Sequence, residues 1–178
     1  ERDERGEDAA DAGEERHDVG RAWIRVESES IADVVRSPAM RTPRYTRRLD
    51  EAIALAVDAF RDRVRKQTDI PYVTHLLQVM VTVGEHGGDE EQMIAAVLHD
   101  YLEDIEQATV EELRNRFGPR VAAMVEALSD TVEHPKPPWR PRKEAYLAGL
   151  RDKPAEVKLV VASDKLHNAQ TILHDLAL

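Results

Sequence analysis

The sequence predicts an all-α fold in which a single helical bundle follows an acidic N-terminal extension. Three observations lead to this expectation. Apolar residues recur at helical spacing from Leu49 onward, no stretch shows the sustained two-residue alternation of a half-buried strand, and Asp89 with Gln92 has the pattern of a reciprocal helix cap. With 178 residues, one domain is the default, and a chain of this length can bury a core without disulfides or a structural metal.

The extension is expected to cover residues 1–45 and to be largely disordered or irregular, and the helical domain is expected to cover residues 46–178. Residues 1–18 contain nine Asp or Glu against three Arg, so they carry −6 of the formal net charge of −10. An acidic tail on a nearly balanced domain argues against nucleic-acid binding, which needs a basic face.

The helices of the bundle are predicted from apolar spacing and from stop signals such as Gly87-Gly88. Thr109 with Glu112 repeats the capping pattern of Asp89 with Gln92. A proline-rich basic loop is expected over residues 131–141. In chain order, the predicted helices cover residues 46–66, 74–86, 89–104, 110–117, 119–130, 142–151 and 154–177.

Composition limits both the location of the protein and its possible metal sites. The chain has no cysteine, which excludes disulfides and thiolate ligands and fits a reducing compartment. No apolar run approaches the roughly 20 residues of a membrane span, and the N-terminus has no apolar signal core. We therefore expect a cytoplasmic protein with no membrane partner, in which any transition metal is held by histidine and carboxylate side chains.

One predicted helical segment carries an imidazole and three carboxylates close together. At about 100° per residue, His99 and Asp100 lie side by side, and Glu103 and Asp104 follow one turn later. The apolar run 93–98 before them indicates a buried helix that delivers polar ligands into an apolar environment. The segment therefore predicts a metal site at His99 and Asp100, with a solvated helix face as the alternative.

Further ligands must come from other helices. His75 is one candidate, although an isolated histidine is more often a surface or capping residue. Asp164 follows an apolar run, and a buried carboxylate must be paired, neutralised or metal-bound; an ion pair with Lys165 or an arginine is an equal alternative. Two imidazoles with two carboxylates suit manganese, iron, cobalt or nickel, with zinc possible.

Cations near these residues indicate a phosphate-containing substrate. Arg65 and Lys66 precede His75 across a short loop and could meet a phosphate or stack on a base, with a solvated helix end as the alternative. A second basic group could line the entrance to the site: Lys136, Arg140, Arg142 and Lys143. Surface or packing roles are assigned to the remaining histidines of the bundle, namely His86, His134 and His167.

These motifs, in this order, resemble the HD-domain metal phosphohydrolases. Within that family they resemble the hydrolase domain of RelA/SpoT-type alarmone enzymes and the small stand-alone alarmone hydrolases. The resemblance covers about residues 49–173 and rests on Arg65-Lys66 with Pro71-Tyr72-x-x-His75, Ala95-Ala96-x-Leu98-His99-Asp100-x-x-Glu103-Asp104, Phe117-Gly118 with Val121 and Val125, and Asp164-Lys165-Leu166-His167-Asn168.

The resemblance implies a role for each matching residue. One Mn²⁺-like ion, or another divalent metal such as Zn²⁺, Co²⁺, Ni²⁺ or Fe²⁺, would be held by His75, His99, Asp100 and Asp164. Glu103 and Asp104 would activate water. The substrate would be bound by Arg65, Lys66, Asn168 and Thr171. The implied reaction removes the 3′-pyrophosphate from guanosine tetra- or pentaphosphate; the alternatives are another nucleotide substrate or a non-catalytic nucleotide sensor.

Overall fold

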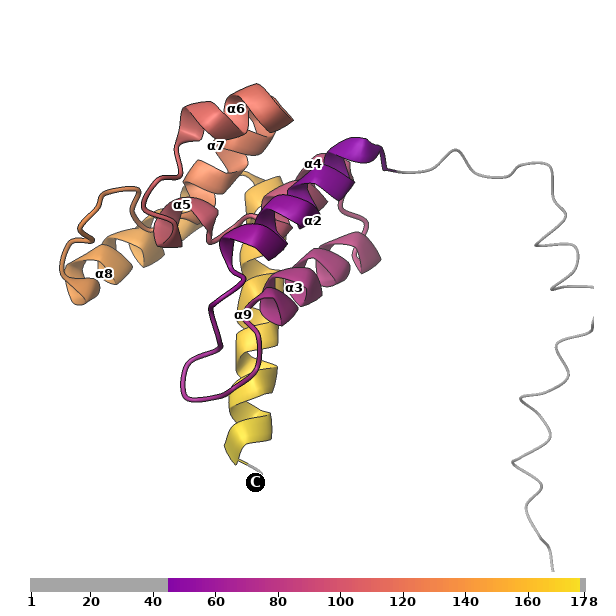
Figure 1. Cartoon of the computed structure of the whole chain (residues 1–178). Coiled ribbons are helices and arrows are strands. Elements are labelled where there is room, and N and C mark those ends of the chain that lie inside the picture. Colours follow the sequence, from indigo (N-terminus) through magenta and orange to yellow (C-terminus); the bar gives the residue numbers. More distant parts are fainter. Residues whose placement is uncertain (1–44, 177–178) are drawn as a thin grey trace, which may run out of the picture. The chain divides into compact units, whose positions relative to one another are not determined.

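The structure, a computed structural model, describes residues 45–176 (Figure 1). Every regular element in that part of the chain is a helix, and the connecting segments are turns that include one isolated β-bridge. The predicted all-α class is confirmed. The expectations for residues 1–44 and for a last helix reaching Ala177 lie outside the described residues. The helices are α2 (Arg47–Ala59), α3 (Val73–Glu85), α4 (Glu90–Val97), α5 (Tyr101–Asp104), α6 (Val110–Phe117), α7 (Pro119–Leu128), α8 (Trp139–Gly149), the 3₁₀ turn η1 (Leu150–Asp152) and α9 (Ala155–Leu176).

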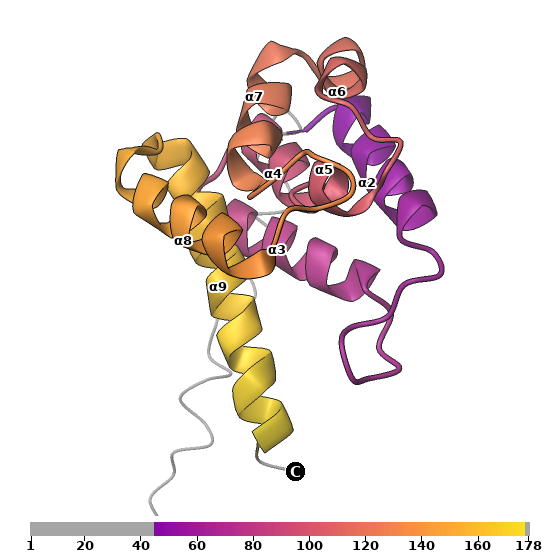
Figure 2. The same ribbon diagram turned by 90° about the vertical axis from the view of Figure 1, so that its left-hand side faces the viewer.

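Helix α4 lies at the centre of the bundle and contacts α2, α3, α7 and α9 (Figure 2). Every residue from Ile94 to Leu98 is fully buried. Ala95 and Ala96 have small side chains, which lets the neighbouring helices approach closely. A polar residue directly after this run is therefore delivered into the core.

Helix α9 belongs to the core only through its first half. Val157 and Val160 are buried against α3, α4 and α7, whereas Ile172 and Leu173 near its end are exposed, because this half extends past the other helices (Figures 1 and 2). Asp164 lies between the two halves, where the helix leaves the core. None of the described helices is long and apolar enough to cross a membrane.

The two predicted capping pairs differ in the structure. Asp89 accepts a hydrogen bond from the Gln92 N–H at 2.9 Å, and the Asp89 N–H donates to Gln92 Oε1 at 3.0 Å, which confirms the reciprocal cap. Thr109 accepts from the Glu112 N–H, but the Glu112 carboxylate accepts from the Tyr101 hydroxyl instead of returning to the cap. The second prediction is therefore half right.

The first predicted helix is too long, because α2 ends at Ala59 and the chain turns back over residues 60–72. Val64 continues the apolar spacing of the helix, yet its side chain is 55% exposed. The Arg65 N–H donates to the Ile70 carbonyl at 2.8 Å, so backbone pairing across a turn replaces helical hydrogen bonds. Apolar spacing alone could not distinguish these two arrangements.

Helix α8 begins at Trp139, three residues before the predicted start at Arg142. Pro141 lies in its first turn, where backbone N–H groups have no helical partner, so the missing donor costs nothing. None of the α8 residues is buried. Apolar packing therefore does not explain how α8 is attached to the bundle.

Arg120 joins three helices through carboxylates. Its guanidinium lies 2.8 Å from Asp89, 2.9 Å from Glu91 and 2.6 Å from Glu156, linking α7 to the starts of α4 and α9. Burial by itself raises the pKa of Asp89, but the Gln92 N–H and Arg120 outweigh it and lower that pKa; hydrogen bonds from Arg120 and Arg48 lower the pKa of Glu91.

We expect Arg120→Met to lower the free energy of unfolding by about 1 kcal/mol at pH 7. Because the folded-state pKa values of Asp89 and Glu91 are lowered, their contribution is present above the unfolded value of about 4 and is lost as pH falls below it. Urea unfolding at pH 7 and pH 3 measures both effects. Arg140→Met, which removes one exposed pair, is the control; an Arg120 effect that is undiminished at pH 3 would contradict the ionic origin.

Candidate metal centre

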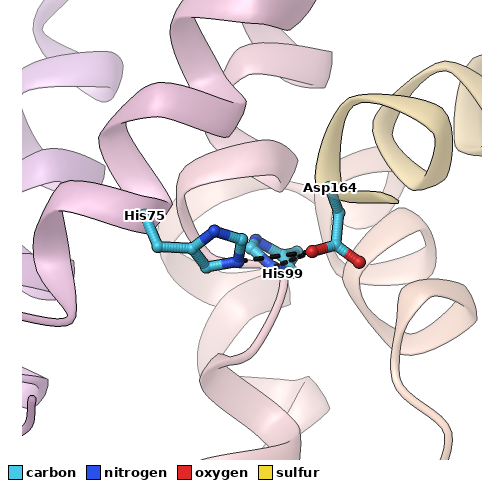
Figure 3. A group of neighbouring side chains, drawn as sticks. All are labelled: His75, His99 and Asp164. Carbon is cyan, nitrogen blue, oxygen red and sulfur yellow. Dashed lines mark ion pairs between the residues drawn. The ribbon is translucent and has the colours of Figure 1, made fainter. Parts of the chain in front are cut away.

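Three predicted ligands from distant parts of the sequence converge at one point (Figure 3). His75 comes from α3, His99 from the segment between α4 and α5, and Asp164 from α9. One ligand atom of each lies within 4.8 Å of the others. Asp164 Oδ1 is 3.3 Å from His75 Nε2 and 3.8 Å from His99 Nε2. Both imidazoles are almost fully buried.

The prediction of one continuous helix over residues 89–104 is wrong, because the helix is interrupted at His99. Helix α4 ends at Val97, and α5 begins at Tyr101. His99 Nδ1 lies 2.7 Å from the carbonyl of Ala96 and donates to it. The imidazole therefore satisfies a carbonyl in the last turn of α4, and its other nitrogen faces the centre.

The environment of His99 fits a cation. Its Nε2 is buried without a hydrogen-bond partner; Asp100 Oδ2 is 3.1 Å away but not in hydrogen-bond geometry. Burial lowers the pKa of His99, yet the carboxylates of Asp100 and Asp164 outweigh it and raise the pKa to about 9. Two imidazole nitrogens next to buried carboxylates form a donor set suited to a divalent metal ion.

Asp100 lies beside this group, although it is not one of the three residues that converge. Its Oδ2 accepts a hydrogen bond from the Tyr72 hydroxyl at 2.5 Å. Burial raises the pKa of Asp100, but His99 and the Tyr72 hydroxyl outweigh it and hold the pKa below its usual range. Its role as a fourth ligand remains a prediction.

Asp164 makes the ion pair with Lys165 that the sequence left open, and its role as a metal ligand stays a prediction. Its Oδ2 pairs with Lys165 Nζ at 2.5 Å, while Oδ1 faces the two imidazoles and accepts from Asn168 Nδ2 at 2.6 Å. Burial raises the pKa of Asp164, but His75 and the charges of His99 and Lys165 lower it to about 2. One oxygen can therefore serve an ion pair while the other serves the centre.

His167, to which a surface or packing role was assigned, contacts the predicted ligand His75. Its Nδ1 lies 2.7 Å from His75 Nδ1 and 3.2 Å from Arg65 Nη1. His167 is three residues after Asp164 on the same helix, a spacing that places the two side chains on one face. That spacing was the signal available in the sequence. His86 is exposed and bonds to the Thr82 carbonyl at the end of α3, which fits the surface role assigned to it.

The predicted substrate-binding residues divide between two hollows. Arg65, Lys66 and Asn168 line a cavity of about 310 Å³ that also contains His75, Asp100, Glu103, Asp104, Asp164, Tyr72, Lys143 and Lys165. Arg65 Nη2 lies 3.3 Å from Asn168 Oδ1, so Arg65 points into the site and is not a solvated helix end. Thr171 lines a neighbouring hollow of about 410 Å³ that shares Arg65 with the first.

Cations from the proline-rich loop and α8 hold the acidic pair. Lys136 Nζ is 2.6 Å from Asp104 and 3.3 Å from Glu103, and Arg142 Nη1 is 3.0 Å from Glu103. Arg140, the fourth member of the predicted basic group, pairs with Glu144 on the exposed side of α8 instead. Lys143 lines the cavity at the centre, Lys136 lines a neighbouring hollow that shares Glu103 and Asp104 with it, and Arg142 contacts Glu103, so the prediction is wrong for Arg140.

Arg142 also contacts Asp130, whose side chain is 2% exposed, while that of Arg142 is 9% exposed. Lys143 is a second partner of Asp130. Since α8 buries no residue, this ion network is what attaches the helix beside Glu103.

A family model described as HD domain matches residues 52–176, which is most of the chain and includes every residue of the centre. The chain belongs to the HD-domain family. The predicted resemblance to HD-domain proteins is thereby confirmed.

Several relatives of this HD domain have names that refer to guanosine polyphosphates. A guanosine-3′,5′-bis(diphosphate) 3′-pyrophosphohydrolase of Aquifex aeolicus is 34% identical over 132 residues, which are 73% of this chain and 18% of the relative. SpoT of Escherichia coli, a bifunctional (p)ppGpp synthase/hydrolase, is 33% identical over 71% of this chain and 18% of its own length. A GTP pyrophosphokinase of Streptomyces coelicolor is 30% identical over 71% of this chain and 15% of its own length. The chain thus spans less than a fifth of these relatives.

A solved structure is similar over a larger share of its length. It is described as "A metazoan ortholog of SpoT hydrolyzes ppGpp and plays a role in starvation responses", and it superimposes with a TM-score of 0.65 at 27% identity. The match covers 71% of this chain and 70% of that one. The HD domain therefore shares its fold with a protein of similar size.

We expect Arg142→Met to lower the free energy of unfolding of the HD domain by about 2–4 kcal/mol, because it leaves the buried Asp130 with Lys143 as its remaining partner. Chemical denaturation measures the change, with Arg140→Met on the same helix as control. Adding Asp130→Asn should recover part of the loss, since the unpaired charge is then removed. An additive double variant would show that the two residues do not form a stabilising pair.

Proposed function

We propose that this HD domain is a metal-dependent phosphohydrolase that removes the 3′-pyrophosphate from guanosine tetra- or pentaphosphate, giving GDP or GTP and pyrophosphate. The observation that carries the proposal is the convergence of His75, His99 and Asp164 beside a cavity lined by both cationic and carboxylate side chains. The names of the relatives support the choice of substrate.

In this proposal, the ion is held by His75, His99, Asp100 and Asp164. Nitrogen and oxygen donors without a thiolate suit Mn²⁺, and Zn²⁺, Co²⁺, Ni²⁺ or Fe²⁺ are alternatives. Such an ion lowers the pKa of a bound water and polarises a phosphate oxygen. The buried, unpartnered Nε2 of His99 supports its role as a ligand.

Charge complementarity supports a polyphosphate in the cavity. Arg65, Lys66 and Lys143 line it, and Lys165 extends the basic wall past Asp164. Arg65 also borders the second hollow, where Thr171 lies, so a nucleotide can place its phosphates at the metal and its base or sugar toward α9. Asn168 sits between the two and offers amide hydrogen bonds to a sugar.

Glu103 and Asp104 are proposed to take the proton from the attacking water. Their contacts with Lys136 and Arg142 fix the two carboxylates at the edge of the cavity. A carboxylate held in a fixed position can accept a proton without first rearranging its own side chain. Lys136 and Lys143 both contact Glu103, and their flexible side chains can turn toward an incoming phosphate.

The proposed partner is a nucleotide and not a nucleic acid, because the net charge of −10 opposes binding to a phosphate polymer. The absence of cysteine supports the cytoplasm as the location.

The function is tested by adding Mn²⁺ to metal-stripped protein and measuring pyrophosphate release from guanosine tetraphosphate. We expect turnover by the wild type and none above background by Asp100→Ala. Parallel assays with other nucleotides compare substrates, because a monophosphatase releases phosphate and no pyrophosphate. Turnover of another nucleotide alone would overturn the choice of substrate, and tight binding without any turnover would identify a sensor.

We expect Asp104→Asn to lower kcat by about 10²–10⁴ and to leave Mn²⁺ affinity nearly unchanged, because the amide cannot accept the proton. Steady-state kinetics and a chelator competition measure the two quantities. Glu106→Gln, an exposed neighbour two residues further on, is the matched control. A kcat equal to that of the wild type would exclude Asp104 as the base.

A further inference from the structure

We propose that His167 is a positioning residue that selects the tautomer of His75, and that Arg65 in turn selects the tautomer of His167. The inference rests on the proposed metal centre but not on the identity of the nucleotide. It gives His167 a role and gives Arg65 a second role that operates before any nucleotide binds.

The two histidine rings meet edge to edge. Their Nδ1 atoms are 2.7 Å apart, their centroids 4.9 Å apart, and their planes differ by 29°. The centroid separation is close to the nitrogen–nitrogen distance plus two ring radii, so the nitrogens point at each other along nearly coplanar rings. A contact this short requires one N–H and one lone pair, because two N–H groups or two lone pairs would repel.

Arg65 decides which ring is the acceptor. Its Nη1 lies 3.2 Å from the same Nδ1 of His167, and a guanidinium has donors only. A proton on His167 Nδ1 would lie beside the Arg65 guanidinium, which also carries protons and a positive charge. His167 Nδ1 therefore presents its lone pair, and its own proton is on Nε2.

The consequence reaches the centre through His75. If His167 Nδ1 is the acceptor, His75 Nδ1 carries the proton and donates it. The neutral His75 ring then has its lone pair on Nε2, the nitrogen that lies 3.3 Å from Asp164 Oδ1 and faces the centre. This is the tautomer that a metal ligand needs.

Without His167, the opposite tautomer of His75 is favoured. Asp164 is a carboxylate and would attract a proton to His75 Nε2, which would hide the lone pair from a cation. The hydrogen bond to His167 thus opposes the pull of Asp164. A second connection runs in parallel, since Arg65 Nη2 contacts Asn168, and Asn168 donates to Asp164.

A purely structural role for His167 makes a different prediction. His167 is half-buried on α9, and a phenylalanine of similar shape would fill its place. If packing is its only role, His167→Phe leaves the His75 tautomer and the metal affinity unchanged, whereas a positioning role requires an acceptor atom at this position.

The first experiment is ¹⁵N NMR of the imidazoles in the metal-free protein, where ring-nitrogen shifts distinguish the tautomers. We expect His75 to be protonated on Nδ1 and His167 on Nε2 in the wild type. In His167→Phe, we expect His75 to shift toward the Nε2-protonated form. A wild-type His75 with its proton on Nε2 would overturn the proposal.

The second experiment measures Mn²⁺ affinity by chelator competition without nucleotide. We expect about 10–100-fold weaker binding by His167→Phe and substantial recovery by His167→Gln, whose amide oxygen can accept from His75. His174→Phe, on an exposed turn of the same helix, should bind Mn²⁺ as the wild type does. Wild-type affinity in His167→Phe, or no Mn²⁺ binding by the wild type itself, would overturn the proposal.

Arg65→Met provides an independent variant in a half-exposed loop. We expect it to weaken Mn²⁺ binding in the absence of nucleotide, because His167 is then free to place its proton on Nδ1. Lys66→Met, which changes the neighbouring cation of the same cavity, should leave this nucleotide-free affinity unchanged. Equal effects of the two variants would point to the general field of the cavity and refute the Arg65–His167 contact. A failure of alarmone hydrolysis would leave all these metal and NMR results unaffected, so the two proposals can fail separately.

Discussion

Burial of polar side chains where α3, α4 and α9 meet is the constraint on which the rest of the structure depends. A buried polar atom without a partner costs about 1–3 kcal/mol, so each side chain around the centre is held by a polar contact with the protein. His75 contacts His167, His99 donates to the Ala96 carbonyl, and Asp100 accepts from Tyr72. Among these groups, His99 Nε2 is left without a hydrogen bond and so remains for a ligand.

This constraint also explains the break between α4 and α5. A continuous helix would keep the backbone near Ala96 hydrogen-bonded to itself and leave His99 Nδ1 without a partner in the core. Ending the helix at Val97 frees a carbonyl for the imidazole and turns the next residues, with Glu103 and Asp104, toward the cavity. The interruption of the central helix therefore places His99 beside His75 and Asp164, and Glu103 and Asp104 at the neighbouring cavity.

The sequence was sufficient where a local pattern determines the structure. The all-α class and the cap at Asp89 followed from local spacing, and the convergence of His75, His99 and Asp164 followed from the resemblance to a known family. It was insufficient where distant contacts decide. Val64 kept the apolar period of a helix that had already ended, and the place of His167 depends on Arg65, 102 residues away in the chain. Local patterns contain no information on such partners.

The centre of the site and the walls around it are held by different interactions. This difference indicates which residues can be substituted among HD domains. The centre is held by buried helices, whereas the walls come from the turn 60–72, the proline-rich loop and α8, which is attached by charges and buries no residue. Loops and charge-held helices tolerate substitution better than a packed core. Relatives named as a pyrophosphohydrolase and as a pyrophosphokinase match over 73% and 71% of this chain but over only 18% and 15% of their own length, so their names do not determine its activity. In the proposed function, Arg65 and Lys143 line the cavity that a nucleotide would fill, so their contacts are where the choice of nucleotide would be made.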